Sequence, residues 1–160
     1  MIRGWLLPVI AATAAAPASA QPRTLGAFGS WAAFRDGARC YAITQPYQSP
    51  EARGWQPFAA IGDWPGRGSQ LHIRLSREKR QGSAVLLKID GRAFQLTGGG
   101  RDAWAPDARA DAEIQTAMRT GIDFVVETRS ADGQLVRDLY RLRGAATAMD
   151  AAAIACAPGR

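Results

Sequence analysis

Residues 85–96, VLLKIDGRAFQL, give the clearest structural pattern in the chain. Apolar side chains recur at every second position on both sides of an Asp-Gly pair, which is typical of two strands joined by a tight turn. A two-residue Asp-Gly loop requires positive φ at both turn positions, as in a type I′ turn. This loop places Leu87 opposite Phe94 and Val85 opposite Leu96. Because turn and pattern agree, the sequence predicts an antiparallel hairpin.

Residues 122–143 predict a second hairpin, in which the length of the loop decides the register. A three-residue loop at residues 131–133 pairs Phe124 with Tyr140 on an apolar face. A two-residue loop would instead place Phe124 opposite Arg141, and a shift of one residue inverts every side chain. Three-residue loops with glycine in the left-handed position are common in hairpins. We therefore predict the three-residue loop.

Aromatic and β-branched residues between turn residues predict four further strands, at residues 28–35, 39–45, 58–64 and 71–76. In the last of these, Leu71, Ile73 and Leu75 alternate with polar residues, so His72 is expected to point toward solvent. The predicted fold is mainly β, a single antiparallel β-sandwich-like domain.

Two short helices interrupt the strands, at about residues 107–119 and 147–156. Asp107 or Asp111 is placed to cap the first helix. Thr147 and Asp150 have the spacing of a capping box at the start of the second.

The first twenty residues have the organisation of a secretory signal peptide. A basic start at Arg3 precedes an uncharged, largely apolar run over residues 5–16, and small residues lead up to Ala20. We expect cleavage after Ala20, which leaves one domain over residues 21–160 in the periplasm or outside the cell. The apolar run is shorter than the roughly 20 residues that cross a bilayer, so no transmembrane segment is expected.

Two cysteines remain after this cleavage, Cys40 and Cys156. An even count in an oxidising compartment predicts one disulfide between them, and the apolar face of the second helix directs Cys156 toward the domain. His72 is the only histidine and no C-x-x-C pair is present, so neither a metal nor another cofactor is expected.

The chain resembles the invasion-associated locus B family of exported bacterial proteins, from about Leu25 to Cys156. The resemblance rests on motifs near both ends: Gly29-Ser30-Trp31, Asp36-Gly37, Arg39-Cys40-Tyr41, Asp138, Tyr140, Leu142-Arg143-Gly144, Ala148 and Cys156. It implies a β-sandwich-like exported domain. It transfers no catalytic residue to this chain.

One cluster of acids and one separate aspartate are candidates for catalysis or metal binding. Asp102, Asp107, Asp111 and Glu113 are close in sequence, but they lack the spacing of a calcium loop and favour helix capping. Asp138 shares the expected buried face with Tyr140. It is either a general acid or, as we favour, a carboxylate held by a backbone amide or an arginine.

Three tryptophans, Trp55, Trp64 and Trp104, lie beside Gly and Pro in expected loops. There they either form a platform for a ligand or plug the open ends of the sandwich, and we favour the plug.

The formal net charge is +6 at pH 7. A candidate anion-binding surface, the basic stripe, consists of His72, Arg74, Arg77, Lys79 and Arg80. Export would offer it anionic lipid or lipopolysaccharide and makes nucleic acid an unsuitable partner. The alternative is a solvated edge kept charged against aggregation, which we favour.

No motif of a hydrolase, metalloprotease or phosphate-binding loop is present in the sequence. The leading hypothesis is a non-enzymatic module that binds a protein or another envelope component. The alternative is a small periplasmic hydrolase that uses Asp138 or the acids at 102–113.

Overall fold

The computed structural model describes residues 21–51, 54–64 and 68–157, so the predicted signal peptide at residues 1–20 lies outside the described residues. Within these ranges the chain forms ten strands and two helices. In chain order they are β1 (Arg23–Phe28), β2 (Trp31–Asp36), β3 (Arg39–Thr44), β4 (Phe58–Trp64), β5 (Gly68–Arg74), β6 (Val85–Ile89), β7 (Arg92–Gly99), β8 (Asp102–Trp104), α1 (Ala108–Thr120), β9 (Asp123–Arg129), β10 (Leu135–Arg141) and α2 (Ala145–Cys156).

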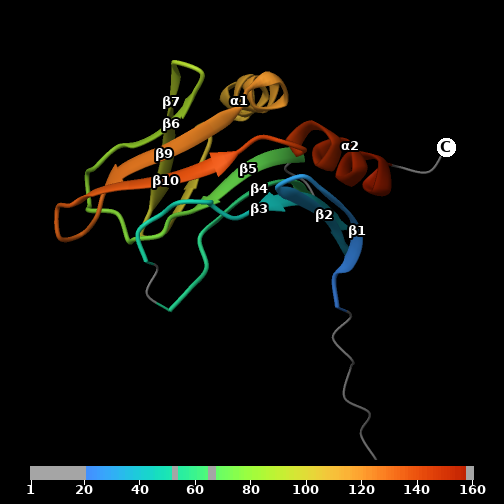
Figure 1. Ribbon diagram of the computed structural model, residues 1–160, viewed down its shortest axis with the longest axis horizontal. Coiled ribbons are helices and arrows are strands. Elements are labelled where there is room, and N and C mark those ends of the chain that lie inside the picture. The colour runs from blue at the N-terminus through green and yellow to red at the C-terminus, as the bar shows by residue number, and fades with distance from the viewer. Residues whose placement is uncertain (1–20, 52–53, 65–67, 158–160) are drawn as a thin grey trace, which may run out of the picture.

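The strands make one antiparallel sheet in the order β1-β2-β3-β4-β5-β8-β7-β6-β9-β10. The sheet bends over on itself into two layers, and in Figure 1 β9 and β10 cross above β3, β4 and β5. Strand β7 runs from one layer into the other, because residues 92–96 pair with β6 and residues 97–99 pair with β8. The mainly β, sandwich-like prediction is confirmed, with both layers built from a single sheet.

The close pairing of β7 with β8 depends on a glycine at the passage between layers. A Cβ atom at Gly98 would lie 2.2 Å from the carbonyl oxygen of Asp102. No side chain fits that space, so the two strands can approach only with glycine at position 98.

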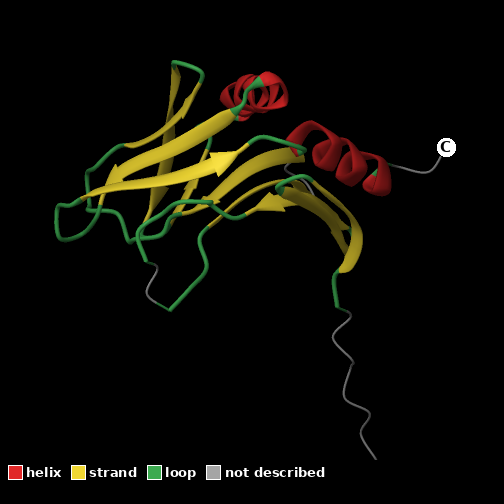
Figure 2. Ribbon diagram, viewed as in Figure 1, coloured by secondary structure: helices red, strands yellow, loops and turns green. Residues whose placement is uncertain are grey.

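The core lies between the two layers, where most strands turn an apolar, buried face inward. Its members include Leu71, Ile73, Leu87, Ile89, Phe124, Val126 and Tyr140. Helix α2 covers the same face of β1, β2 and β3. Both helices lie on this side of the sheet in Figure 2. The indole nitrogen of Trp31 donates to the carbonyl of Arg141 at 2.9 Å and links the layers.

Both hairpins have the predicted register. Asp90 and Gly91 have φ angles of 46° and 82°, as a type I′ turn requires, and Leu87 lies opposite Phe94. Phe124 lies opposite Tyr140, as the three-residue loop predicts.

The helices confirm one predicted cap and correct the other. Asp107 caps α1 by accepting a hydrogen bond from the amide of Ala110 at 2.8 Å. The capping box at Thr147 is wrong, because α2 begins at Ala145 and its N-cap is Gly144, without a side-chain hydrogen bond. Gly144 has φ of 91°, and a Cβ there would lie 1.8 Å from the carbonyl oxygen of Phe28. This close approach to the end of β1 fixes where the helix begins.

Candidate functional site

One side of the sheet layer that contains β2, β3, β4, β5 and β8 is covered by the core, and its opposite side is open. We call this open side the outer face. Neighbouring strands align a row of side chains across it: Ala32, Ile43, Ala60, His72 and Trp104. The residues that alternate with them, such as Ala42, Ile61, Ile73 and Ala103, are buried in the core. Ala60, in the middle of this row, is buried, whereas Trp104 at its β8 end is exposed, so a ligand can reach the outer face there.

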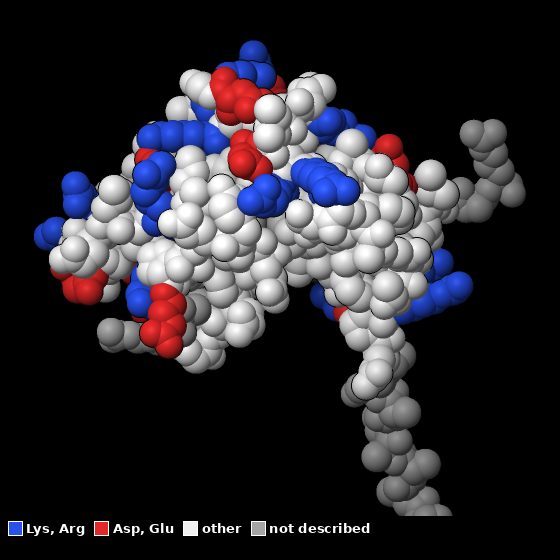
Figure 3. All heavy atoms as spheres, in the orientation of Figure 1, with Lys and Arg blue, Asp and Glu red and all other residues white. Residues whose placement is uncertain are grey.

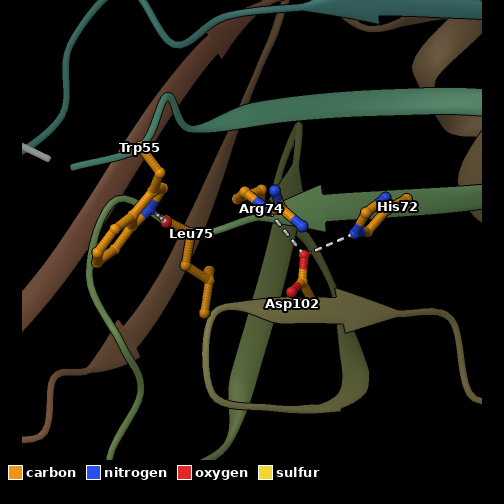
Figure 4. Close-up of polar contacts among 5 residues, drawn as sticks. All are labelled: Trp55, His72, Arg74, Leu75 and Asp102. Carbon is orange, nitrogen blue, oxygen red and sulfur yellow. Dashed lines mark hydrogen bonds and ion pairs between the residues drawn. The ribbon is translucent and has the colours of Figure 1, made fainter. Parts of the chain in front are cut away.

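A carboxylate on β8 organises the polar side chains of the outer face (Figure 4). The Oδ1 atom of Asp102 lies 2.8 Å from Nε2 of His72 and 3.0 Å from Nε of Arg74, and both groups donate to it. Partial burial raises the pKa of Asp102, but the hydrogen bonds from Arg74 and His72 outweigh burial and hold the pKa below its ordinary value. Asp102 is thus ionised at neutral pH and offsets the charge of Arg74.

Aromatic rings surround this polar group. Trp104 stacks on His72 with ring centroids 5.3 Å apart and an interplanar angle of 10°. Phe58 meets His72 edge-on at 5.0 Å, and the guanidinium of Arg74 lies 5.4 Å from the centre of the Phe58 ring. Trp104 remains 37% exposed. We call Phe58, His72, Arg74, Asp102 and Trp104 the outer-face cluster.

A groove of about 580 Å³ adjoins this cluster on the outer face. Its lining includes Ala32, Ile43, Gln45, Gln56 and Phe58, and none of the described residues that line it is charged. In Figure 3 the molecule is hollowed on its lower side, below the position of β2–β4 in Figure 1, and mostly uncharged atoms surround the hollow. Phe58 belongs to both the groove and the cluster, so the two form one continuous surface.

The tryptophans differ in their roles. The indole nitrogen of Trp55 donates to the carbonyl of Leu75 at 2.7 Å, and the guanidinium of Arg101 lies 4.4 Å from the ring centre, so Trp55 fastens its loop to these residues. That it plugs an end of the sandwich stays a prediction. Trp104 was expected in a loop, and that expectation is wrong because it lies in β8. The side chain of Trp64 is not among those described.

The residues of the basic stripe do not form one continuous exposed surface. His72 and Arg74 share one face of β5 as expected, but His72 is only 17% exposed and both bind Asp102. The Nη1 atom of Arg77 is buried, and within the described part of the chain it has no hydrogen-bond partner. Arg80 is exposed and Lys79 is half-buried. Anion binding by Lys79 and Arg80 stays a prediction.

Asp138 is completely buried, and its carboxylate is held by one residue. It accepts hydrogen bonds from the backbone amide of Ser76 at 3.0 Å and from the Ser76 hydroxyl at 2.5 Å. Burial raises the pKa of Asp138, and the hydrogen bonds from Ser76 and the charge of Arg77 lower it only in part. The backbone-amide interpretation is confirmed. A carboxylate without exposed surface offers a substrate no approach in this conformation.

The other acids serve separate purposes. Asp111 is buried and accepts the amide of Leu71 at 2.8 Å, which attaches α1 to β5. Glu113 pairs with Arg109 on the surface of α1. Among the residues that the structure describes, no group of three His, Cys, Asp or Glu is placed to hold a metal ion. The four acids at residues 102–113 are close in the sequence, but in the fold each has a separate set of contacts.

Cys40 and Cys156 lie at disulfide distance, with Cα atoms 5.8 Å apart, and join β3 to the last residue of α2. In the described ranges, no helix has the length and apolar character to cross a bilayer.

The sequence matches no family model, and no curated protein is similar to it. Among solved structures, the fold is similar to that of invasion associated protein B from Bartonella henselae. The similarity covers 78% of this chain and 92% of that chain, with a TM-score of 0.54 and 14% sequence identity. At this identity the comparison concerns the fold alone. The chain is thus a distant structural relative of invasion associated protein B.

Proposed function

We propose that this chain is an exported, non-enzymatic binding module that takes a component of the bacterial envelope on its outer face. One observation carries the proposal: an uncharged groove runs through Phe58 into a cluster that presents a half-exposed tryptophan. The volume of about 580 Å³ is within the range of known ligand sites, about 300–1,000 Å³.

The cluster has the composition expected of a binding surface. Tryptophan and arginine contribute disproportionately to affinity, because they combine a large contact area with polar groups of fixed direction. Here Asp102 fixes the direction of Arg74, and Trp104 is supported from one side by His72. A ligand would therefore meet side chains that lose little freedom on binding.

Export is proposed from two features of the chain. The first twenty residues have the organisation of a signal peptide, and the cysteine pair suits an oxidising compartment. The distant structural similarity is compatible with an envelope role, and it is not the basis of the proposal. Asp138 offers no comparable support for a hydrolase, since it is fully buried.

The test is co-sedimentation of the purified protein with envelope fragments from its own cell. We expect Trp104→Ala to weaken binding about tenfold or more, because the ligand loses its aromatic contact. Tyr47→Ala is the matched control: Tyr47 is 47% exposed but contacts Arg141 of β10, away from the outer face. If Trp104→Ala binds like the wild type, or if Tyr47→Ala loses binding equally, the proposed site is wrong.

A further inference from the structure

We infer that the ligand of the outer face is a neutral oligosaccharide, whose sugar ring stacks on Trp104 while its hydroxyls bind Asp102 and Arg74. This inference rests on the proposed function and adds the chemical class of the ligand. Three features of the outer-face cluster carry it: an open shelf beside the ring, unused hydrogen-bonding atoms, and a cancelled charge.

The shelf is formed by β7, which runs beside β8. Its residues opposite Trp104 and Asp102 are Thr97 and Gly99, one short and exposed and one without a side chain. A Cβ atom built at Gly99 would meet nothing within 4 Å. His72 stacks on Trp104 from the β5 side. A flat apolar group, such as the C–H face of a pyranose ring, would lie on the exposed part of Trp104 and extend over the space at Gly99.

The polar atoms beside the shelf suit vicinal hydroxyls. Among the described residues, His72 and Arg74 both bind Oδ1 of Asp102, so Oδ2 is available as an acceptor. Arg74 binds Asp102 through Nε, which leaves its two Nη groups as donors. The side chains of Asp102 and Arg74 are 26% and 39% exposed. A hydroxyl both donates and accepts, so neighbouring hydroxyls can satisfy the carboxylate and the guanidinium together.

The net charge of the cluster favours an uncharged ligand. Arg74 and ionised Asp102 cancel, and the cluster is neutral when His72 is neutral. A phosphate or carboxylate placed on Arg74 would also meet the charge of Asp102. The uncharged groove beyond Phe58 extends the surface past one ring, with amide groups from Gln45 and Gln56 in its lining. An oligosaccharide should therefore bind more tightly than its monosaccharide.

The experiment titrates the purified protein with N-acetylglucosamine tetramer and with cellotetraose, by calorimetry and tryptophan fluorescence. We expect at least one tetrasaccharide to bind, with affinity that hardly changes with salt. Trp104→Ala should weaken binding about tenfold or more, and Trp104→Phe should retain part of it. Tyr47→Ala should bind like the wild type.

Two further variants separate this inference from its rivals without deleting the aromatic contact. Gly99→Leu should block the shelf while leaving the fold intact, because the added side chain meets open space. Asp102→Asn gives the cluster a net positive charge. This variant should bind the tetrasaccharide about tenfold more weakly than the wild type and should bind anionic phosphatidylglycerol vesicles more tightly.

The results distinguish failure of the inference from failure of the proposed function. If neither tetrasaccharide binds, or if Gly99→Leu binds as well as the wild type, the saccharide inference is overturned. Envelope binding that still depends on Trp104 would then leave the proposed function standing with another ligand. Steep weakening by salt would instead assign the surface to an anion and also overturn the inference.

Discussion

Asp138 shows how a single buried carboxylate serves this fold. It lies on β10, and both of its oxygens accept hydrogen bonds from Ser76, which follows β5 in the opposite layer. The hydroxyl of Tyr140 is also buried, and among the described residues it has no hydrogen-bond partner. Burial, and then the nearby Asp138, raise the pKa of Tyr140 well above its ordinary value. Asp138 thus links the two layers through its hydrogen bonds to Ser76, although burial disfavours the charged form of its carboxylate.

Replacing Asp138 by Asn is expected to change how stability depends on pH. Because the folded pKa of Asp138 is raised, the native state holds this proton more tightly than the unfolded state. The wild-type free energy of unfolding therefore falls as pH rises from the ordinary aspartate value, about 3.9, through the raised one. Asn does not titrate, so the free energy of unfolding of Asp138→Asn should rise relative to that of the wild type across that pH window. Urea unfolding at a series of pH values measures the difference.

Asp138→Ala is the companion variant, since it removes both acceptors and leaves the amide of Ser76 without its partner. Its free energy of unfolding should be about 1–3 kcal/mol below that of Asp138→Asn at every pH, since neither variant carries the titrating group. A constant difference between Asp138→Asn and the wild type across the pH series would contradict the raised pKa.

At the scale of elements, the sequence predicts those whose pattern and turn are local. The two long hairpins are of this kind, since Asp90-Gly91 and the loop at residues 131–133 each set a register that the apolar residues confirm. Strand β8 has only three residues, too few for a periodic pattern, and it exists because β5 and β7 pair with it on both sides. The outer-face cluster was missed for the same reason. Trp104 joins His72 only once β8 lies beside β5.

The start of α2 was missed because it depends on a distant contact. Thr147 and Asp150 have the spacing of a cap, but Gly144 packs against the end of β1 and begins the helix earlier. Asp150 instead pairs with Arg119 of α1 at 2.8 Å. A glycine before a helix is visible in the sequence, whereas its closeness to Phe28 is not.

Gly144→Ala should destabilise the protein by more than about 3 kcal/mol, since the new Cβ meets both left-handed strain and the carbonyl of Phe28. Gly133→Ala is the matched control. Gly133 has a similar φ of 85°, but its Cβ would meet only Arg80 Nη1, at 4.0 Å. It should cost about 1 kcal/mol from strain alone. Denaturant unfolding of both variants measures the two losses, and equal losses would show that the contact with Phe28 is unimportant.

At the scale of the whole molecule, the two sides of the bent sheet have different roles. In the layer that contains β2, β3, β4, β5 and β8, the inner side is covered by the second layer and by α2, which pack the core. The outer face of that layer is left free to carry the groove and the cluster. The side chains proposed to bind therefore stand on strands in the middle of the sheet, which holds them more firmly than loops would.

Cys40 and Cys156 close a loop that spans most of the domain, with a sequence separation of 116 residues. Their reduction is expected to lower the free energy of unfolding by about 2–5 kcal/mol, because the unfolded chain regains the freedom that the link removes. Denaturant unfolding with and without reductant measures this loss, and Cys40→Ala with Cys156→Ala should reproduce it without reductant. Two thiols that react in the unfolded, unreduced protein would contradict the link.

The position of that link in the chain also has a consequence for timing. If the protein is threaded through a membrane from its N-terminus, Cys40 in β3 reaches the oxidising side before β4 to β10 and both helices. Cys156 is the last residue of α2 and arrives after all of them. The link can then close only on a chain whose strands have all been delivered. A chain stalled in transit would keep its first thiol reduced and remain open to recapture or degradation, so the bond would mark a completed passage.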